Sequence, residues 1–492
     1  MNEDLGTALI AAARDWPQRD AYRFNGTAIN YGELADRARA MAACLIDQGV
    51  TPGDRVAIAM TKGLDMPVAI HGIWMAGAAF VPFDPSAPVA RLAGILRDCE
   101  ISVVLSADRN QKLAAALAAE HPITVIGTEV DGAQCVQPDP ERLADPHHNR
   151  RDDLAYIIFT SGSTGVPKGI CHTHASGLAF ARTWVDHYQL SKDDVFFSTV
   201  PLHFDFSLAD FFTPAMVGAV TELVPEQVLL FPASLAAHLE KTKGTIWSSV
   251  PYTFIQLCER GAVETRDLSC LRWLIYGGEP LPPAKLPLLR QTFSAEISNS
   301  YGPAEVNQVS EYSVPLDHPE DTPIPIGYAS NHATLRIGDE DELLVASSSM
   351  MRGYWNRPDL NQDAFVHLDG TRFYRTGDRV YRDDKGLWMF AGREDRQIKL
   401  RGHRIELDEV EMALAAHDAV SEAAVVVSED GVRLQRIVTL VPNIDVTGAD
   451  LITHAKGVLP SYAVPDHIEI RPSFEKTSTG KINRRVLAKE AP

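Results

Sequence analysis

The sequence lacks closely spaced cysteines. Its six cysteines are scattered over 492 residues, and no two of them form a Cys-x-x-Cys motif. Zinc sites and disulfide frameworks both depend on recognisable cysteine spacings, so the sequence argues against both kinds of site. We expect six reduced and largely buried thiols, as is typical of a cytoplasmic protein.

An excess of basic residues is also missing. The formal net charge is −19, which argues against a nucleic-acid-binding protein that relies on attraction to phosphates. The first residues, MNEDLGTAL, are acidic where a secretory signal peptide needs basic ones. Residues 396–492 contain 13 Lys and Arg against 14 Asp and Glu, so nearly all of the net acidity lies before them. This uneven distribution of charge indicates that the chain has at least two domains.

A membrane-spanning run is absent as well. Residues 66–83 come closest to one, because His71 is the only polar side chain among these 18 residues. Two prolines and two glycines interrupt the run, and an aspartate flanks it at each end (Pro67, Gly72, Gly77, Pro82, Asp65 and Asp84). We therefore expect a buried helix followed by a buried strand, and no membrane partner.

A Walker A motif is missing, although a loop suited to phosphates is present. Residues 159–170 read FTSGSTGVPKGI and follow an apolar, strand-like run. Small residues let backbone N–H groups approach phosphate oxygens, hydroxyls add donors, and Lys168 adds a positive charge. Gly169 stands where a Walker A motif needs Ser or Thr, so the loop argues against a P-loop nucleotide hydrolase.

Short apolar runs alternate with helix-like segments through most of the chain. The runs occupy residues 53–60, 101–105, 123–127, 155–159, 245–250 and 271–278. This alternation predicts an α/β fold with buried sheets. Single cores rarely grow beyond roughly 250–300 residues, so at least two domains are expected. After the charged stretch 392–406, a short amphipathic helix and two strand-like runs predict a small α+β domain.

Five segments together resemble the adenylate-forming superfamily, which includes acyl-CoA synthetases, peptide-synthetase adenylation domains and beetle luciferases. They are YIIFTSGSTGVPKGI (156–170), NSYGPAE (299–305), YRTGD (374–378), GREDRQIKLRGHRIE (392–406) and TSTGKINR (477–484). The resemblance implies a large N-terminal domain of stacked mixed sheets with flanking helices, followed by a small mobile α+β domain. It places the adenylation core at 1–394, the lid at 395–492 and the hinge at Asp395.

The resemblance also implies the reaction and its residues. A carboxylate attacks the α-phosphate of ATP in the presence of Mg²⁺, and a thiol then takes the acyl group. Lys481, Glu305, Lys168 and Arg393 are expected to be catalytic, and Glu305 is expected to hold the metal, since Mg²⁺ prefers carboxylate oxygen. The expected nucleotide-binding residues are Thr160, Ser161, Gly162, Ser163, Thr164, Gly165, Lys168, Gly278, Glu279, Pro280, Asn299, Ser300, Tyr301, Gly302, Asp378, Arg393 and Lys481.

The sequence departs from the family at Ala304. The family usually has Thr or Ser there, whose hydroxyl touches the α-phosphate. Loss of one neutral hydrogen bond costs roughly 0.5–1.5 kcal/mol, which would slow the reaction by up to about tenfold without abolishing it. A weakened, ATP-binding regulatory homologue is therefore one alternative to an active enzyme.

The segment PLHFDFSLADFF (201–212) bears on the acid that is activated. Amino-acid-activating members of the family carry FDxS, whose Asp pairs with the α-ammonium group of the substrate. In this chain that residue is Asp205, although an Asp here could also cap a helix. Leaving such an Asp unpaired in the site costs roughly 3–5 kcal/mol, which would select amino acids over other carboxylic acids.

Aligning the chain on its motifs gives a pocket for the substrate side chain. Its expected lining is Asp205, Phe206, Ala209, Ser249, Ile275, Gly277, Ser300, Gln308 and Val309. Polar lining favours a substrate that can form hydrogen bonds, because burying unpaired polar groups is costly. A small or medium polar amino acid such as threonine or serine is therefore favoured. Alanine and proline stay open, since PLHFD and GGEPLP resemble stand-alone D-alanine and L-proline ligases.

The thiol that accepts the acyl group is expected to come from another molecule. The chain ends 11 residues after Lys481 and contains no phosphopantetheine-attachment pattern. We predict transfer to a separate carrier protein in the biosynthesis of a peptide-type or hybrid natural product, with Lys399 and Gly402 along the path of the thiol. An acyl-CoA ligase for a non-amino acid is the alternative.

Overall fold

The computed structural model describes residues 4–160, 167–393, 396–400, 402–427, 435–440, 446–471, 473–475, 482 and 487. Contacts divide the chain into two compact units. The larger unit comprises residues 1–85, 96–159 and 169–394, and the smaller unit comprises 86–95, 160–168 and 395–492. Sequence reasoning placed the two short segments of the smaller unit in the first domain. The core and lid roles of 1–394 and 395–492 stay a prediction.

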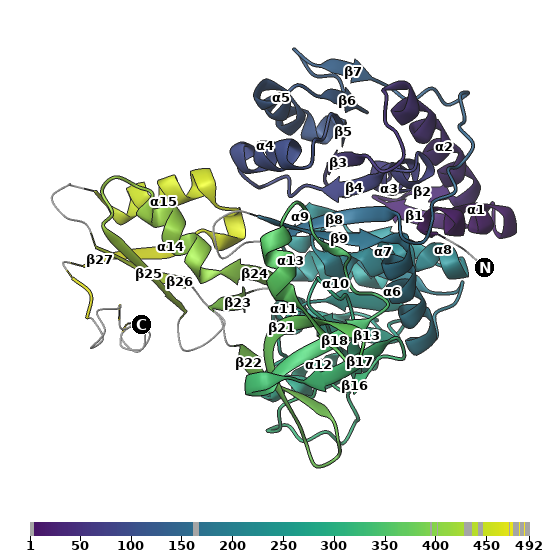
Figure 1. Ribbon diagram of the computed structural model, residues 1–492. Coiled ribbons are helices and arrows are strands. Elements are labelled where there is room, and N and C mark those ends of the chain that lie inside the picture. The colour runs from purple at the N-terminus through teal and green to yellow at the C-terminus, as the bar shows by residue number, and fades with distance from the viewer. Residues whose placement is uncertain are drawn as a thin grey trace. The chain divides into compact units, whose positions relative to one another are not determined.

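An eight-stranded sheet is built mainly from the first part of the larger unit, with a short strand from residues 353–354 at one edge (Figure 1). Five of its strand pairs are parallel, and most of the strands in them are nearly continuous apolar runs because both faces are buried. The predicted strands 53–60, 101–105, 123–127 and 155–159 all lie in it. Its order is β19 (Gly353–Tyr354), β9 (Lys168–Thr173), β8 (Leu154–Thr160), β4 (Ala79–Pro82), β3 (Arg55–Ala59), β5 (Val103–Ser106), β6 (Thr124–Ile126) and β7 (Gln134–Val136).

A nine-stranded sheet follows, and it carries most of the predicted site. Its central strands are parallel, whereas β2, β15 and β16 pair antiparallel at its two edges. The predicted strands 245–250 and 271–278 are β12 and β13. Its order is β16 (Tyr328–Ala329), β15 (Ser310–Ser313), β14 (Glu296–Tyr301), β13 (Trp273–Gly277), β12 (Ile246–Ser249), β10 (Val195–Ser198), β11 (Val220–Leu223), β1 (Asp20–Phe24) and β2 (Thr27–Asn30).

A smaller antiparallel sheet completes the larger unit. It contains β17 (Ala333–Ile337), β18 (Glu342–Ser347), β21 (Thr371–Arg382), β20 (Phe365–Leu368) and β22 (Trp388–Arg393), with β22 paired to β21. The long strand β21 positions the YRTGD motif, and β22 ends at Arg393. The predicted mixed-sheet α/β architecture is therefore confirmed.

The principal helices of residues 1–394 cover these sheets (Figure 1). They are α1 (Leu5–Asp15), α2 (Tyr31–Asp47), α3 (Asp65–Met75), α4 (Val89–Asp98), α5 (Gln111–Glu120), α6 (His174–His187), α7 (Ala209–Phe212), α8 (Pro214–Val217), α9 (Glu226–Leu229), α10 (Pro232–Thr242), α11 (Pro251–Arg260), α12 (Leu286–Thr292) and α13 (Pro358–Ala364). The apolar run 66–83 forms α3 and β4 as expected, and no described helix is long and apolar enough to cross a bilayer.

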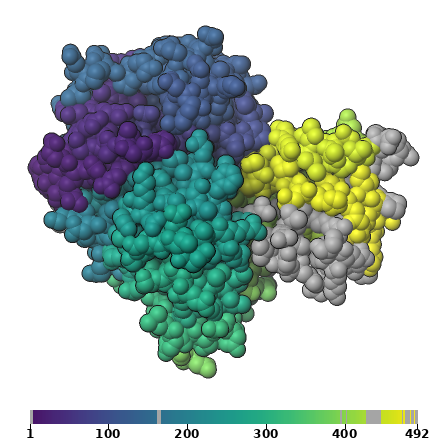
Figure 2. All heavy atoms as spheres, turned by 180° about the vertical axis from the view of Figure 1, so that it is seen from behind, coloured from purple at the N-terminus to yellow at the C-terminus, as the bar shows by residue number. Residues whose placement is uncertain are grey.

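One large hydrophobic cluster joins the helices to the first two sheets. Trp74 on α3 lies at its centre and is fully buried, with its ring against Phe80 and Phe212. Its indole N–H donates to the carbonyl of Ala155 at 2.9 Å, which satisfies the only polar atom of the ring. Figure 2 shows the purple N-terminal residues beside the teal middle of the chain, in agreement with the packing of α1 on α8.

The smaller unit has an α+β composition. A hairpin of β23 (Gln397–Leu400) and β24 (His403–Glu406) precedes α14 (Leu407–Ala415). A three-stranded sheet of β25 (Glu422–Val427), β26 (Gln435–Leu440) and β27 (His467–Arg471) packs with α14 and α15 (Gly448–Val458). Leu414 and Leu451 are fully buried between these elements. The small α+β domain predicted from the sequence is confirmed.

Candidate active site

Several of the predicted nucleotide-binding residues of the larger unit lie where adjacent parallel strands end. Strand β13 ends at Gly277 and leads into Gly278–Pro280, and the neighbouring β14 carries Asn299, Ser300 and Tyr301. The two strands pair in register, with Gly277 opposite Ser300. Ligands of α/β sheets bind beyond the carboxyl ends of such strands. Gly278 has φ +82°, a conformation that favours glycine and turns the chain at this edge.

Asp378 is the centre of a buried polar cluster. It lies directly opposite Arg393 on the antiparallel pair β21–β22, and one guanidinium nitrogen of Arg393 donates to its Oδ1. The phenol of Tyr301 on β14 donates to Oδ2. Burial, together with the neighbouring Asp378 carboxylate, holds the pKa of Tyr301 well above its usual value, so the phenol keeps its proton. Three motifs separated in sequence therefore meet at one carboxylate.

The Asp378 carboxylate keeps capacity for a ligand. A carboxylate has about four lone-pair positions, and the two hydrogen bonds occupy one on each oxygen. Thr376 fixes the backbone beside it, because its hydroxyl accepts from the Asp378 N–H at 3.0 Å and donates to the Leu343 carbonyl at 2.8 Å. Asp378 can thus accept two further donors, as a ribose with two hydroxyls would offer. The sequence motif contained Thr376, but its supporting role required the structure.

Glu305 is fully buried and is held by a residue that sequence reasoning missed. The phenol of Tyr354 on β19 donates to Glu305 Oε1 at 2.9 Å, and the phenol of Tyr374 lies 3.3 Å from that of Tyr354. Among the described residues there is no group of three or more His, Cys, Asp or Glu side chains suited to a metal. One carboxylate nevertheless fits Mg²⁺, which takes its other ligands from phosphates and water.

The loop between β14 and β15 sets the position of Glu305. Its ends are joined by the Val309 N–H, which donates to the Tyr301 carbonyl at 2.9 Å. Ala304 packs beside a hydrophobic cluster, and its carbonyl lies 2.8 Å from His172 Nε2. Burial lowers the pKa of His172 to about 4, so the ring is neutral and can donate through this nitrogen. His172 therefore anchors the segment in which the usual hydroxyl residue is missing.

Most of the predicted side-chain pocket is brought together. Asp205 and Phe206 begin the short 3₁₀ helix η2 (Asp205–Leu208), which runs directly into α7. The Phe206 ring lies so close to Gly277 that a Cβ there would stand 3.2 Å from it. Ala209 and Ile275 are fully buried in the same cluster, which Phe206 contacts. Val309 differs, because it packs in another cluster with Tyr301 and Val306.

The polar lining of this pocket is largely paired within the protein. The Ser300 hydroxyl donates to Gln308 Oε1 at 2.8 Å, and the Gln308 amide donates to Glu311 at 3.3 Å. The Ser249 hydroxyl lies 3.4 Å from that of Thr199. The sequence argument for a polar substrate assumed that these groups need partners from a ligand. Because they find partners in one another, that assumption does not hold for Ser300 and Gln308.

The remaining predicted residues belong to the smaller unit or lie outside the described residues. Thr160 ends β8, and its buried hydroxyl has no hydrogen-bond partner among the described residues, which suits a group that awaits a ligand. Lys168 begins β9. Lys399 lies on β23, and Gly402 precedes β24 with φ +83°. Ser161, Gly162, Ser163, Thr164, Gly165, Asp395 and Lys481 lie outside the described residues.

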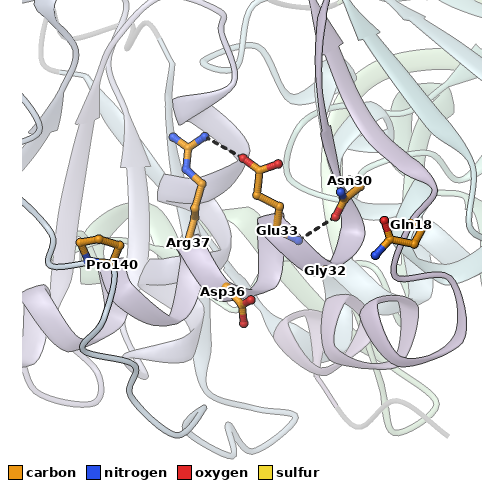
Figure 3. Close-up of a pocket in the computed structure, with 7 residues that line it drawn as sticks. All are labelled: Gln18, Asn30, Gly32, Glu33, Asp36, Arg37 and Pro140. Carbon is orange, nitrogen blue, oxygen red and sulfur yellow. Dashed lines mark hydrogen bonds and ion pairs between the residues drawn. The ribbon is translucent and has the colours of Figure 1, made fainter.

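A surface pocket of about 370 Å³ lies elsewhere in the larger unit (Figure 3). It is lined by Gln18, Asn30, Gly32, Glu33, Asp36, Arg37 and Pro140. Its polar groups engage each other, since the Glu33 N–H donates to the cap residue Asn30 at 2.8 Å and Arg37 lies 4.0 Å from the Glu33 carboxylate. None of the predicted site residues lines it, so we assign it no part in the site.

Comparison with known proteins supports the family that the sequence motifs indicate. A family model described as AMP-binding enzyme matches residues 9–355, and one described as AMP-binding enzyme C-terminal domain matches residues 409–481. An L-proline–[L-prolyl-carrier protein] ligase of Pseudomonas fluorescens is 32% identical over 99% of both chains. Gramicidin S synthase 2 of Brevibacillus brevis is 31% identical over 99% of this chain, which spans 11% of that protein.

Solved structures agree on the fold. The adenylation domain AlmE of Vibrio cholerae, in complex with glycyl-adenosine-5'-phosphate, has a TM-score of 0.88 and 24% identity, with 100% of this chain and 98% of that chain covered. The predicted family resemblance and fold are thus confirmed across nearly the whole sequence. The chain belongs to the AMP-binding enzyme family, whose members form adenylates, and it is an ATP-dependent ligase of that family.

Proposed function

We propose that this protein is a stand-alone adenylation enzyme that activates a small amino acid with ATP and loads it onto a separate carrier protein. The observation that carries this proposal is the end-to-end match with a carrier-protein ligase of the same length. Asp205 in the FDFS segment supports the choice of an amino acid. The position of Asp205 is consistent with this role, since the cap position of η2 is Phe204 and no side chain caps it.

The chemistry needs cations and donors aimed at phosphate. A carboxylate oxygen of the amino acid attacks the α-phosphorus, a carbonyl–oxygen–phosphorus bond forms, and pyrophosphate leaves with the electron pair of the broken P–O bond. A thiol sulfur then attacks the carbonyl carbon, and AMP leaves. Bound Mg²⁺ would supply charge neutralisation on the phosphates, with Glu305 as its protein ligand. Asp378 would hold the ribose, and Arg393 would keep the Asp378 carboxylate oriented.

The pocket favours a small apolar side chain. Phe206 fills the space above Gly277, and Ala209 and Ile275 add apolar walls. Ser300 and Gln308 are already paired, so an apolar substrate would leave neither of them without a partner. We therefore propose L-proline or alanine ahead of serine or threonine. The name of the P. fluorescens relative supports proline, and the relation to gramicidin S synthase 2 supports a peptide-type natural product.

Amino-acid-dependent ATP–pyrophosphate exchange tests the proposal. The panel contains L-proline, L- and D-alanine, glycine, serine and threonine, with cyclopentanecarboxylate and propionate as analogues that lack the amino group. We expect exchange with one small amino acid and a loss of two to three orders of magnitude in Asp205→Asn, from roughly 3–5 kcal/mol of lost ion pairing. Asp193→Asn, at an exposed aspartate, is the matched control and should be unaffected.

Other outcomes would favour the alternatives. Exchange with simple carboxylic acids that survives in Asp205→Asn would move the enzyme to the acyl-CoA ligases. Absence of exchange with any acid, while ATP still binds, would favour a weakened regulatory homologue marked by Ala304. Transfer of radiolabelled substrate to a phosphopantetheinylated carrier, compared with transfer to CoA, then identifies the acceptor. The predicted catalytic role of Lys481 is tested in the same assays, since Lys481→Ala should lose exchange but keep transfer from supplied adenylate.

A further inference from the structure

A lysine is buried beside the candidate pocket and has no part in the chemistry described so far. Lys62 follows strand β3, and only 6% of its surface is exposed. Its ammonium group donates to the backbone carbonyl of Ser198 at 2.7 Å and to the Ser198 hydroxyl at 3.1 Å. Both acceptors are neutral, so these contacts alone leave the buried charge uncompensated. Burial lowers the pKa of Lys62 to about 7, and the nearby Asp210 opposes this shift.

Asp210 is a second buried group near Lys62, and it can carry the opposite charge. It lies on α7, is 1% exposed, and accepts a long hydrogen bond of 3.4 Å from the Ser248 hydroxyl. Its Oδ2 has no hydrogen-bond partner among the described residues. Burial raises its pKa to about 6, while Lys62 and the Ser198 hydroxyl favour the charged form. Lys62 therefore contacts Ser198 on β10, Asp210 contacts Ser248 on β12, and these two strands are neighbours in the sheet.

The two residues join three parts of the larger unit. Lys62 comes from the loop after β3 in the eight-stranded sheet, whereas Ser198 and Ser248 lie at the carboxyl ends of β10 and β12 in the nine-stranded sheet. Asp210 belongs to η2–α7, the segment that also carries Asp205, Phe206 and Ala209 of the candidate pocket. Ala209 and Asp210 are consecutive, so a shift of the Asp210 carboxylate would displace the pocket wall.

We propose that Lys62 and Asp210, through their contacts with Ser198 and Ser248, form a positioning element that holds η2–α7 in register with the ends of β10 and β12 and so sets the affinity for the amino acid. This inference rests on the proposed function, because it gives Asp205 and its neighbours the task of binding the substrate. Buried charged groups seldom add net stability relative to apolar residues of similar volume. Two such groups kept at this place are therefore better explained by the orientation they impose than by the stability they add.

The test separates affinity for the amino acid from affinity for ATP. In pyrophosphate exchange, Lys62→Met and Asp210→Asn should each raise the KM for the amino acid at least tenfold, while the KM for ATP stays within twofold. Lys62→Arg, which keeps the charge and donors, should restore most of the affinity. The control Lys241→Met, at an exposed lysine of α10, should change neither KM.

A double variant separates positioning from folding. Lys62→Met combined with Asp210→Leu should unfold within a few degrees of the wild type, because no unpaired buried charge remains, yet its KM for the amino acid should stay raised. A normal KM for the amino acid in this folded double variant would overturn the proposal, and so would equal rises of both KM values in the single variants. Failure of the proposed function would show separately, as wild-type exchange that does not depend on an amino group.

Discussion

Replacing Gly302 with alanine tests whether the loop after β14 positions the candidate site. A Cβ on Gly302 would stand 1.6 Å from the carbonyl oxygen of Asn307, whereas real contacts of this kind stay above 3.0 Å. The distance between this Cβ and the Asn307 carbonyl oxygen must therefore increase by about 1.4 Å. Asn307 cannot easily yield, because its own φ is already +55° and its side chain donates to the Ser349 carbonyl at 3.1 Å.

The movement of the loop that relieves this clash would displace the candidate metal ligand. Glu305 lies between the two colliding residues, and its carboxylate is aligned by Tyr354 at 2.9 Å. A misplacement of about 1 Å in a catalytic group can cost roughly 100-fold in rate, which corresponds to about 2.7 kcal/mol of transition-state stabilisation. We therefore expect Gly302→Ala to lower kcat/KM in pyrophosphate exchange by at least about 100-fold.

The assay needs a measure of folding and a matched control. Gly457 lies on α15, and a Cβ there meets nothing within 4 Å, so Gly457→Ala should leave the exchange rate unchanged and slightly raise the melting temperature. Circular dichroism at the assay temperature confirms that Gly302→Ala is folded. Exchange within threefold of wild type in the folded variant would refute the reasoning, because the loop would then tolerate the shift without moving Glu305.

Two further predictions follow from buried groups. Asp378→Asn should raise the KM for ATP about 10- to 100-fold, since hydrogen bonds to a charged group contribute about 1.5–3 kcal/mol, whereas an unchanged KM would exclude ribose binding there. Burial lowers the pKa of His71 to about 3 and of His174 to about 4. Between those values and about 6.5 only the unfolded chain binds these protons, so stability should fall from pH 7 to pH 5. The urea midpoint of unfolding measures this loss of stability, and His71→Gln should make the loss smaller. A urea midpoint that is the same at pH 7 and pH 5 would contradict the burial of these histidines in the neutral form.

The elements of the fold could be predicted well because local patterns decide them. Asn30, with Glu33 three residues later, forms a capping pattern, and Asn30 indeed caps α2 by accepting from the Glu33 N–H. The apolar run 66–83 divided into a helix and a strand where Gly77, with φ +82°, lies between them. Periodicity and turn residues carry this information within a few positions of the chain.

The interior of the site was less predictable because it depends on residues distant in sequence. The motifs located Tyr301, Asp378 and Arg393 separately. Strand pairing brings Arg393 to Asp378, whereas Tyr301 reaches the same carboxylate from β14 in another sheet. Tyr354 lies 49 positions from the Glu305 that it contacts, and no local pattern marks it. The polar character of Ser300 and Gln308 was read correctly, whereas their mutual hydrogen bond was invisible in a list of side-chain types.

The pairing of β1 with β11 has a consequence for how the chain reaches this structure. Tyr22 aligns with Thr221, so β1 finds its parallel partner only after about 200 more residues have been synthesised. Until then β1 leaves a second edge open besides the one at β2, and open edges can pair with other chains. The closing of this contact is costly in chain entropy and therefore slow. We expect completion of the nine-stranded sheet to be a late event on the ribosome, with aggregation during synthesis as its main competitor.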